Sequence, residues 1–316
     1  MRHGGQTNSV ASAMTLTPVD KGVGALFIGW GLSSMLFGVL VVQGCYYYQR
    51  FPKDGISYKS LVALLVLCEF VHQGFAGHSV WYYSITDRTH ASRPANPVWT
   101  LTAQLVVGLF IGTIVKICYG IRVWKFSGGN VGVTCVIFGL TFAQLGVAVA
   151  WLITTLTIKS HSTEINGGLK AVLFNTYFSM AASTDLLTAI SLSYYLHKMR
   201  KATAKTRVDR FTDSLLVFTV TNGVVTSICS MTLVILFNTE RRNFIYTACY
   251  FVLTKVYSNS CLATFNIRRY IGGKGTEDQT ATGPTFFILG GPPLPEERYK
   301  PVHVTVGQAM SDLKRV

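Results

Sequence analysis

Residues 244–267 read FIYTACYFVLTKVYSNSCLATFNI, a mostly apolar segment with Lys255 near its middle. Six further apolar segments of similar length precede it, at about 23–46, 59–83, 99–121, 131–156, 170–196 and 212–237. About 20 helical residues cross the roughly 30 Å hydrocarbon core of a bilayer. Backbone groups inside lipid must bond within their own segment, so runs of this length indicate helices. The sequence therefore predicts an all-α integral membrane bundle of seven transmembrane helices.

Composition supports a membrane protein. Hydrophobic residues make up 49% of the 316-residue chain and charged residues only 13%, and the mean hydropathy is +0.37. The net charge of +14 is compatible with nucleic-acid binding, but the basic residues flank the apolar segments, which indicates a membrane surface instead. We therefore expect the lipid bilayer as a partner and no nucleic acid.

The positions of the basic residues also predict the orientation, because cytoplasmic ends of transmembrane helices carry more Lys and Arg. The larger group would lie inside: Arg50, Lys53, Lys59, Arg122, Lys125, Lys198, Arg200, Lys201, Lys205, Arg207, Arg210, Arg268, Arg269 and Lys274. The smaller group would lie outside: Arg2, Lys21, Arg88, Arg93, Lys159, Lys170, Arg241 and Arg242. The N-terminus is then outside and the C-terminus cytoplasmic.

This orientation divides the chain into three parts. Residues 1–22 form an extracellular N-terminal tail and residues 23–271 the seven-helix domain. Residues 272–316 are rich in Gly, Pro, Thr and charge, which is typical of a disordered segment, and would form a cytoplasmic tail. No retention signal ends the sequence, so the plasma membrane is the expected location.

Apart from residues at the edges of the spans, four charged residues fall within the predicted helices: Glu69, Lys116, Asp185 and Lys255. Lys116 lies about five residues from the expected cytoplasmic end of its helix, so we expect its side chain to reach the headgroups. The other three lie near the middle of the membrane, where a charge costs roughly 2.5–3.5 kcal/mol on insertion scales and needs a partner or a water-lined cavity.

The spacing of polar residues predicts how these charges are grouped. Lys255, Asn259 and Asn266 share one stripe of their helix, and His72 lies one turn from Glu69. The simplest pairing joins Lys255 to Glu69, Asp185 or both, with His72, Asn259 and Asn266 as hydrogen-bond neighbours. Such a cluster can fix helix register, line a ligand or ion pocket, or carry protons or substrate across the membrane; these three interpretations remain open.

Enzymatic motifs do not appear. The sequence has no GxSxG, P-loop, HExxH or Gly-rich dinucleotide motif. Only His72 and His78 lie within a predicted helix, and no CxxC spacing occurs. We expect neither an enzyme nor a metal site nor a bound cofactor.

The string LxKxYxNSxLATxNxR, from Leu253 through Arg268, resembles a family of basidiomycete fungal membrane proteins. Asp185 and the basic loop before Asp213 are also similar to that family, and the resemblance runs from about 170 to 269. It implies a fungal seven-helix membrane protein that ends in a domain of unknown function. It implies no activity, because the family has no assigned biochemistry.

Two other seven-helix classes are less well matched. A G-protein-coupled receptor shares the orientation and a basic third inner loop, but here Cys118–Arg122 replaces the Asp/Glu-Arg-Tyr motif and Asn259-Ser260 stands in place of Asn-Pro-x-x-Tyr. A rhodopsin would anchor retinal on Lys255, but Phe251 stands where the acidic residue one turn earlier belongs. Retinal binding remains a minor alternative.

The leading hypothesis is a non-enzymatic, receptor-like or sensor-like membrane protein whose small-molecule ligand binds near Glu69, Asp185 and Lys255. The alternative is a transporter or proton-coupled carrier that uses the same charges. Against it, we find no internal repeat and no proline inside a predicted span. A cytoplasmic protein partner would contact the basic loop 197–211 and the tail.

Overall fold

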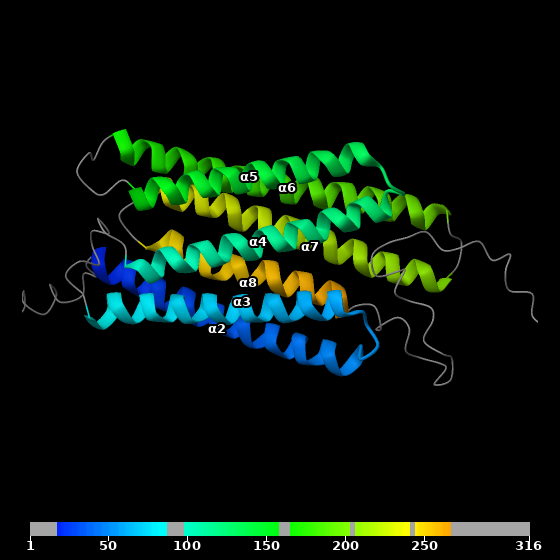
Figure 1. Ribbon diagram of the computed structural model, residues 1–316, viewed down its shortest axis with the longest axis horizontal. Helices are drawn as coiled ribbons and strands as arrows, with labels where there is room; N and C mark the ends of the chain where they lie inside the picture. Colours follow the sequence, from blue (N-terminus) through cyan, green and yellow to red (C-terminus); the bar gives the residue numbers. More distant parts are fainter. Residues whose placement is uncertain (1–17, 87–97, 158–164, 203–205, 241–243, 267–316) are drawn as a thin grey trace, which may run out of the picture.

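The computed structural model describes residues 18–86, 98–157, 165–202, 206–240 and 244–266. Over these ranges the chain forms seven α-helices and no strand, as Figure 1 shows. The helices are α2 (Pro18–Arg50), α3 (Ile56–Trp81), α4 (Trp99–Phe126), α5 (Val131–Thr157), α6 (Ile165–Ala202), α7 (Thr206–Thr239) and α8 (Ile245–Asn266), and a short π-helix, η2 (Tyr82–Thr86), continues α3. The predicted all-α class is confirmed.

Five helices contain segments long and apolar enough to cross a membrane: Gly22–Arg50, Ile56–Thr86, Trp99–Phe126, Val131–Thr157 and Val217–Thr239. They are 23 to 31 residues long, which is roughly 35–46 Å at 1.5 Å per residue and exceeds the hydrocarbon thickness. The chain is thus an integral membrane protein by length and composition. The two helices outside this group, α6 and α8, carry the mid-helix charges Asp185 and Lys255.

Helix α8 is the central helix of the bundle, where it contacts α2, α3, α4 and α7 (Figure 1). Of its 22 residues, 14 are buried. A helix that is covered on nearly every side can hold polar residues that a lipid-facing helix cannot. Its neighbours therefore explain how a helix with a lysine near its middle can lie inside the bundle.

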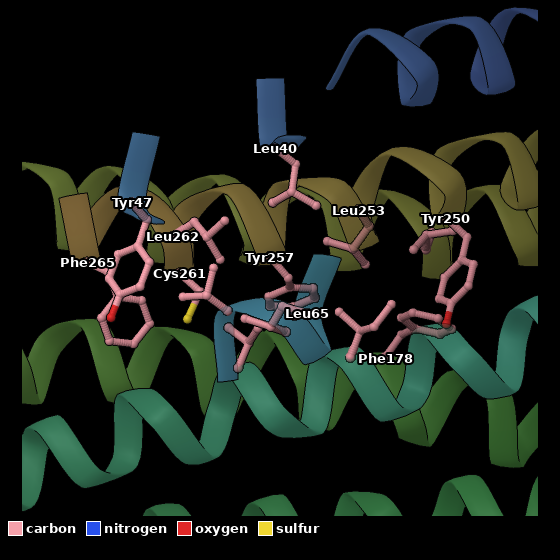
Figure 2. Packing of buried hydrophobic residues seen from close by; sticks show 14 of the residues in the cluster. Leu40, Tyr47, Leu65, Phe178, Tyr250, Leu253, Tyr257, Cys261, Leu262 and Phe265 are labelled. Carbon is pink, nitrogen blue, oxygen red and sulfur yellow. The ribbon is translucent and has the colours of Figure 1, made fainter. Parts of the chain in front are cut away.

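Apolar side chains pack along α8 from several helices (Figure 2). Leu40 and Tyr47 of α2 and Leu65 of α3 belong to this core, and Phe178 of α6 packs near Tyr250. All of them are at most 4% exposed. This core fixes the position of α8 and therefore the position of every polar group that α8 carries.

The helices α6 and α7 extend further than the sequence predicts. The expected spans end at 196 and begin at 212, whereas α6 continues to Ala202 and α7 starts at Thr206. The predicted basic loop 197–211 is therefore mostly helical, because its Ala, Lys, Arg and Met residues favour helix once outside the lipid. Residues 203–205, like both predicted tails except for 18–22, lie outside the described residues.

A tight turn joins α4 to α5. Gly128 and Gly129 have φ of 69° and 87°, in the left-handed region that glycine enters without steric cost. The Gly129 N–H donates to the Trp124 carbonyl at 3.0 Å, which satisfies one of the free carbonyls at the end of α4. The glycine pair is therefore a helix-ending turn.

Candidate functional site

The Lys255 ammonium pairs with the Glu69 carboxylate in the centre of the bundle. Lys255 Nζ contacts Glu69 Oε2, and both side chains are 0% exposed. Ser258, one turn along α8, donates from Oγ to Glu69 Oε1 at 2.6 Å. Both carboxylate oxygens thus have a donor, as a buried charge requires. Of the two partners that the sequence leaves open for Lys255, the structure selects Glu69.

His72 completes this first cluster. Its Nδ1 lies 3.1 Å from Lys255 Nζ. An ammonium group can only donate, so Nδ1 accepts and the ring proton resides on Nε2. The ring is therefore neutral. His72 is itself 0% exposed, so the sealed cluster of Glu69, His72, Lys255 and Ser258 has no side chain open to solvent or ligand.

A second ion pair joins α4 to α6. Lys116 Nζ lies 2.7 Å from Asp185 Oδ1 and 3.2 Å from the Ala181 carbonyl oxygen. The Tyr257 hydroxyl donates to the other carboxylate oxygen, Asp185 Oδ2. Lys116 and Asp185 are 6% and 8% exposed. Asp185 therefore belongs to a separate cluster and does not pair with Lys255.

The expectation that Lys116 reaches the headgroups is wrong. It assumed a helix that ends near 121, but α4 continues to Phe126, which places Lys116 about 15 Å from the helix end at 1.5 Å per residue. A lysine side chain is too short to cover that distance. The charge therefore stays inside the bundle, and Asp185 neutralises it.

Asn259 and Asn266 also differ from expectation, because they connect α8 to α2 rather than to the lysine ammonium. Asn259 Nδ2 donates to the Leu36 carbonyl at 3.0 Å and to the Lys255 carbonyl at 2.8 Å. Asn266 Nδ2 donates to the Gln43 carbonyl at 3.0 Å. Side-chain amides that bond across helices in this way hold transmembrane helices together.

A pocket opens beside the second ion pair, in the space surrounded by α4, α6, α7 and α8. We call it the ion-pair pocket; its lining includes Lys116, Asp185, Thr188, Asn222, Thr226 and Tyr257. The pocket is half open and has about 30 Å³ of space that small molecules can occupy; its empty space is about 410 Å³ when the part open to solvent is included. This space has room for about two water molecules.

Two smaller recesses continue from this pocket along α4, α6 and α8. The middle one shares Lys116 and Tyr257 with the ion-pair pocket. The far one shares Tyr177, Phe178 and Tyr250 with the middle one. Its lining is otherwise apolar, with Leu105, Leu109, Ala148, Trp151 and Phe174. Neighbouring recesses thus share lining residues and lie in sequence along these helices.

Sequence reasoning missed three residues of these clusters: Lys116, Tyr257 and Ser258. Ser258 had a signal, since it follows Lys255 at the i+3 spacing that places two side chains on neighbouring positions of a helix. The charge of Lys116 was a signal too. It was missed because the predicted helix 99–121 is shorter than α4, so Lys116 was placed too close to the helix end. Tyr257 had none, because aromatic residues occur throughout the sequence.

No group of three or more His, Cys, Asp or Glu residues with metal-binding geometry occurs within the described ranges. The two lysines Lys116 and Lys255 are each paired with a carboxylate. The arrangement can hold helices in register and can offer hydrogen bonds to a small molecule.

Comparison with known proteins identifies a domain of a family of unknown function, DUF6534, at residues 181–270. This segment covers most of α6, with α7 and α8, and carries Asp185, Tyr257 and Lys255, whereas Glu69 and Lys116 lie outside it. No curated protein and no solved structure matches the chain. The matched domain supplies half of each ion pair, so the sites are complete only with the N-terminal helices.

Proposed function

We propose that the chain is a receptor-like or sensor-like protein of seven transmembrane helices, which binds a small molecule in the ion-pair pocket. In this proposal α6 and α8 cross the membrane with the five apolar helices, because each lies between them in the bundle. The N-terminus is outside and the C-terminus cytoplasmic, and the protein resides in the plasma membrane without enzymatic activity. The DUF6534 match at residues 181–270 supports the domain of unknown function; membership of a fungal seven-helix family is part of this proposal.

One observation carries the choice of site. Of the two mid-membrane ion pairs, Lys255–Glu69 is sealed, whereas Lys116–Asp185 borders open space. Ligand pockets are mostly apolar with a few well-placed polar groups, and this lining combines one ion pair with threonine methyls and Ala189. The sequence predicts a ligand site near Glu69, Asp185 and Lys255. We propose instead that the ligand binds beside Lys116 and Asp185, in the ion-pair pocket.

Binding can be tested by thermal unfolding of the purified protein in detergent with a library of anionic, cationic, zwitterionic and neutral small molecules. A ligand at 100 times its Kd stabilises the folded state by about 2.7 kcal/mol. We expect at least one class to stabilise the wild type but not Thr188→Phe, which fills the pocket. Ligands that stabilise both proteins equally, or no stabilising ligand in the library, would contradict the proposal.

A transporter is the second candidate, and the line of three recesses along α4, α6 and α8 favours it. Flux of the bound compound into proteoliposomes distinguishes the two roles. A receptor leaves the flux at the level of protein-free vesicles, whereas a carrier raises it. Lys255 is fully buried and borders none of these three recesses, so they give no support to a retinal site.

A further inference from the structure

The geometry points to a specific class of ligand for the ion-pair pocket: a small neutral alcohol with a narrow alkyl tail, whose hydroxyl group lies beside Asn222. This inference rests on the proposed function, since it names the ligand of the same site. Three properties of the pocket lead to it: charge, hydrogen-bonding capacity and shape.

The charge of the pocket is already balanced. Lys116 and Asp185 contribute one positive and one negative charge, and they contact each other at 2.7 Å. Both Asp185 oxygens accept a hydrogen bond, one from Lys116 and one from Tyr257. A charged ligand would add an uncompensated charge in a low-dielectric interior, which is strongly unfavourable. A neutral ligand leaves the pair intact.

Three further polar residues of the lining, Asn222, Thr188 and Thr226, match a hydroxyl group. Asn222 Nδ2 is buried, and no acceptor among the described residues binds it. Thr188 Oγ1 donates to the Thr184 carbonyl at 2.7 Å, and Thr226 Oγ1 donates to the Asn222 carbonyl at 3.0 Å. Both threonine protons are therefore used within their own helices, while the oxygen lone pairs remain able to accept.

A hydroxyl group is complementary to this set, since it accepts from Asn222 and donates to a threonine oxygen. A ketone or an ether can accept from Asn222 but leaves the threonine acceptors without a donor. Buried polar groups without partners cost free energy, so the pocket favours an alcohol over an ether of similar size.

The size and width of the pocket limit the shape of the ligand. The pocket has about 30 Å³ of space that small molecules can occupy, and about 410 Å³ of empty space when the part open to solvent is included. Its lining includes Ala189 of α6 and Gly223 of α7. Gly223 lies against the Ala189 side chain, so α6 and α7 are too close there for a wide ring system.

Photolabelling with 3-azioctanol, an alcohol that carries a diazirine, tests the inference. The purified full-length protein is irradiated with the probe in detergent, and the adducts are located by mass spectrometry. We expect adducts on pocket residues of α6 and α7, and we expect excess 1-octanol to displace them. Octanoate and octylammonium, the charged analogues, should displace at least tenfold less at equal micellar mole fraction.

A matched pair of variants tests the hydrogen bond. Thr226→Val removes a hydroxyl from the pocket with little change of shape and should reduce pocket labelling by about fivefold, the effect of one hydrogen bond of about 1 kcal/mol. Thr232→Val is the control, because Thr232 also lies on α7 and bonds to its own helix but does not line the pocket. It should leave pocket labelling unchanged.

The outcomes separate the ligand class from the site. If octanoate or octylammonium displaces the probe as well as 1-octanol, or if Thr226→Val labels like the wild type, the neutral-alcohol inference is wrong while the pocket remains a ligand site. If Thr188→Phe is labelled at the same residues as the wild type, the probe does not occupy the pocket and the inference also fails. The receptor proposal then depends on the library experiment, in which a charged class can still bind.

Discussion

Replacing Lys255 by methionine should destabilise the bundle strongly. Methionine keeps the length of the side chain but removes the ammonium that contacts Glu69 Oε2 and lies 3.1 Å from His72 Nδ1. The Glu69 carboxylate would keep only the Ser258 bond at 2.6 Å in a fully buried position. Breaking a buried ion pair by removal of one partner costs about 3–5 kcal/mol, and we expect a loss in this range.

The free energy of unfolding, measured in mixed micelles as the denaturing detergent increases, provides the assay. The double variant Lys255→Met/Glu69→Gln distinguishes a lost pair from a packing defect. If the uncompensated carboxylate is the cause, the double variant should recover at least half of the loss, because non-additivity reports the interaction between the two groups. Lys198→Met removes an exposed lysine and should change the free energy by less than about 0.5 kcal/mol.

Two results would refute this reasoning. A loss below about 1 kcal/mol for Lys255→Met would mean that Glu69 is neutral or otherwise compensated. Additive losses in the double variant would mean that the two side chains contribute independently, and the sealed cluster would then not be an ion pair in energetic terms.

Three further changes should affect stability in the same assay. Lys116→Met should cost about 2–3 kcal/mol, less than Lys255→Met, because Tyr257 still donates to Asp185 and the pocket lies alongside. Gly108→Ala should cost about 1–3 kcal/mol, because a methyl group there would overlap the Tyr250 hydroxyl. Asn259→Leu should cost about 1 kcal/mol through loss of the bond to α2.

Controls for these changes are available on the same helices or on neighbours. Gly139→Ala on α5 places a methyl group in open space and should be neutral or stabilising by up to about 1 kcal/mol, since alanine favours helix over glycine. If Gly108→Ala changed the free energy of unfolding no more than Gly139→Ala, the close packing of α4 against α8 at Gly108 would be contradicted. If Lys116→Met and Lys255→Met lowered the free energy of unfolding equally, the expected difference between the Lys116–Asp185 pair beside the pocket and the fully buried Lys255–Glu69 pair would be contradicted.

The helices were predictable because each one is set by local composition. Apolar runs of about 20 residues leave the chain no alternative inside lipid, and the expected segments agree with α2 to α8 to within a few residues at most ends. The errors are larger where charged residues continue a helix outside the membrane. There the apolar run ends but the helix continues: α6 extends to Ala202, and α7 already begins at Thr206.

The pairing of charges was only partly predictable, because it depends on which helices are neighbours. Lys255 with Glu69 was one of the expected pairs, but the spacing along α8 could not exclude Asp185. The pairing depends on the arrangement of the helices in space. Both α3 and α6 lie near α8, but Asp185 of α6 is paired with Lys116 of α4, so Lys255 pairs with Glu69 of α3. Asn259 lies on the same stripe as Lys255 but points its amide at α2, a difference that periodicity does not resolve.

The two ion pairs are not independent, because α8 contributes to both. Lys255 binds Glu69 on one side of the helix, and Tyr257, two residues later, donates to Asp185 on another. A ligand in the ion-pair pocket borders Tyr257 directly, so any displacement of that ring acts on the helix that the sealed cluster holds. The ion-pair pocket and the sealed cluster are therefore linked through α8.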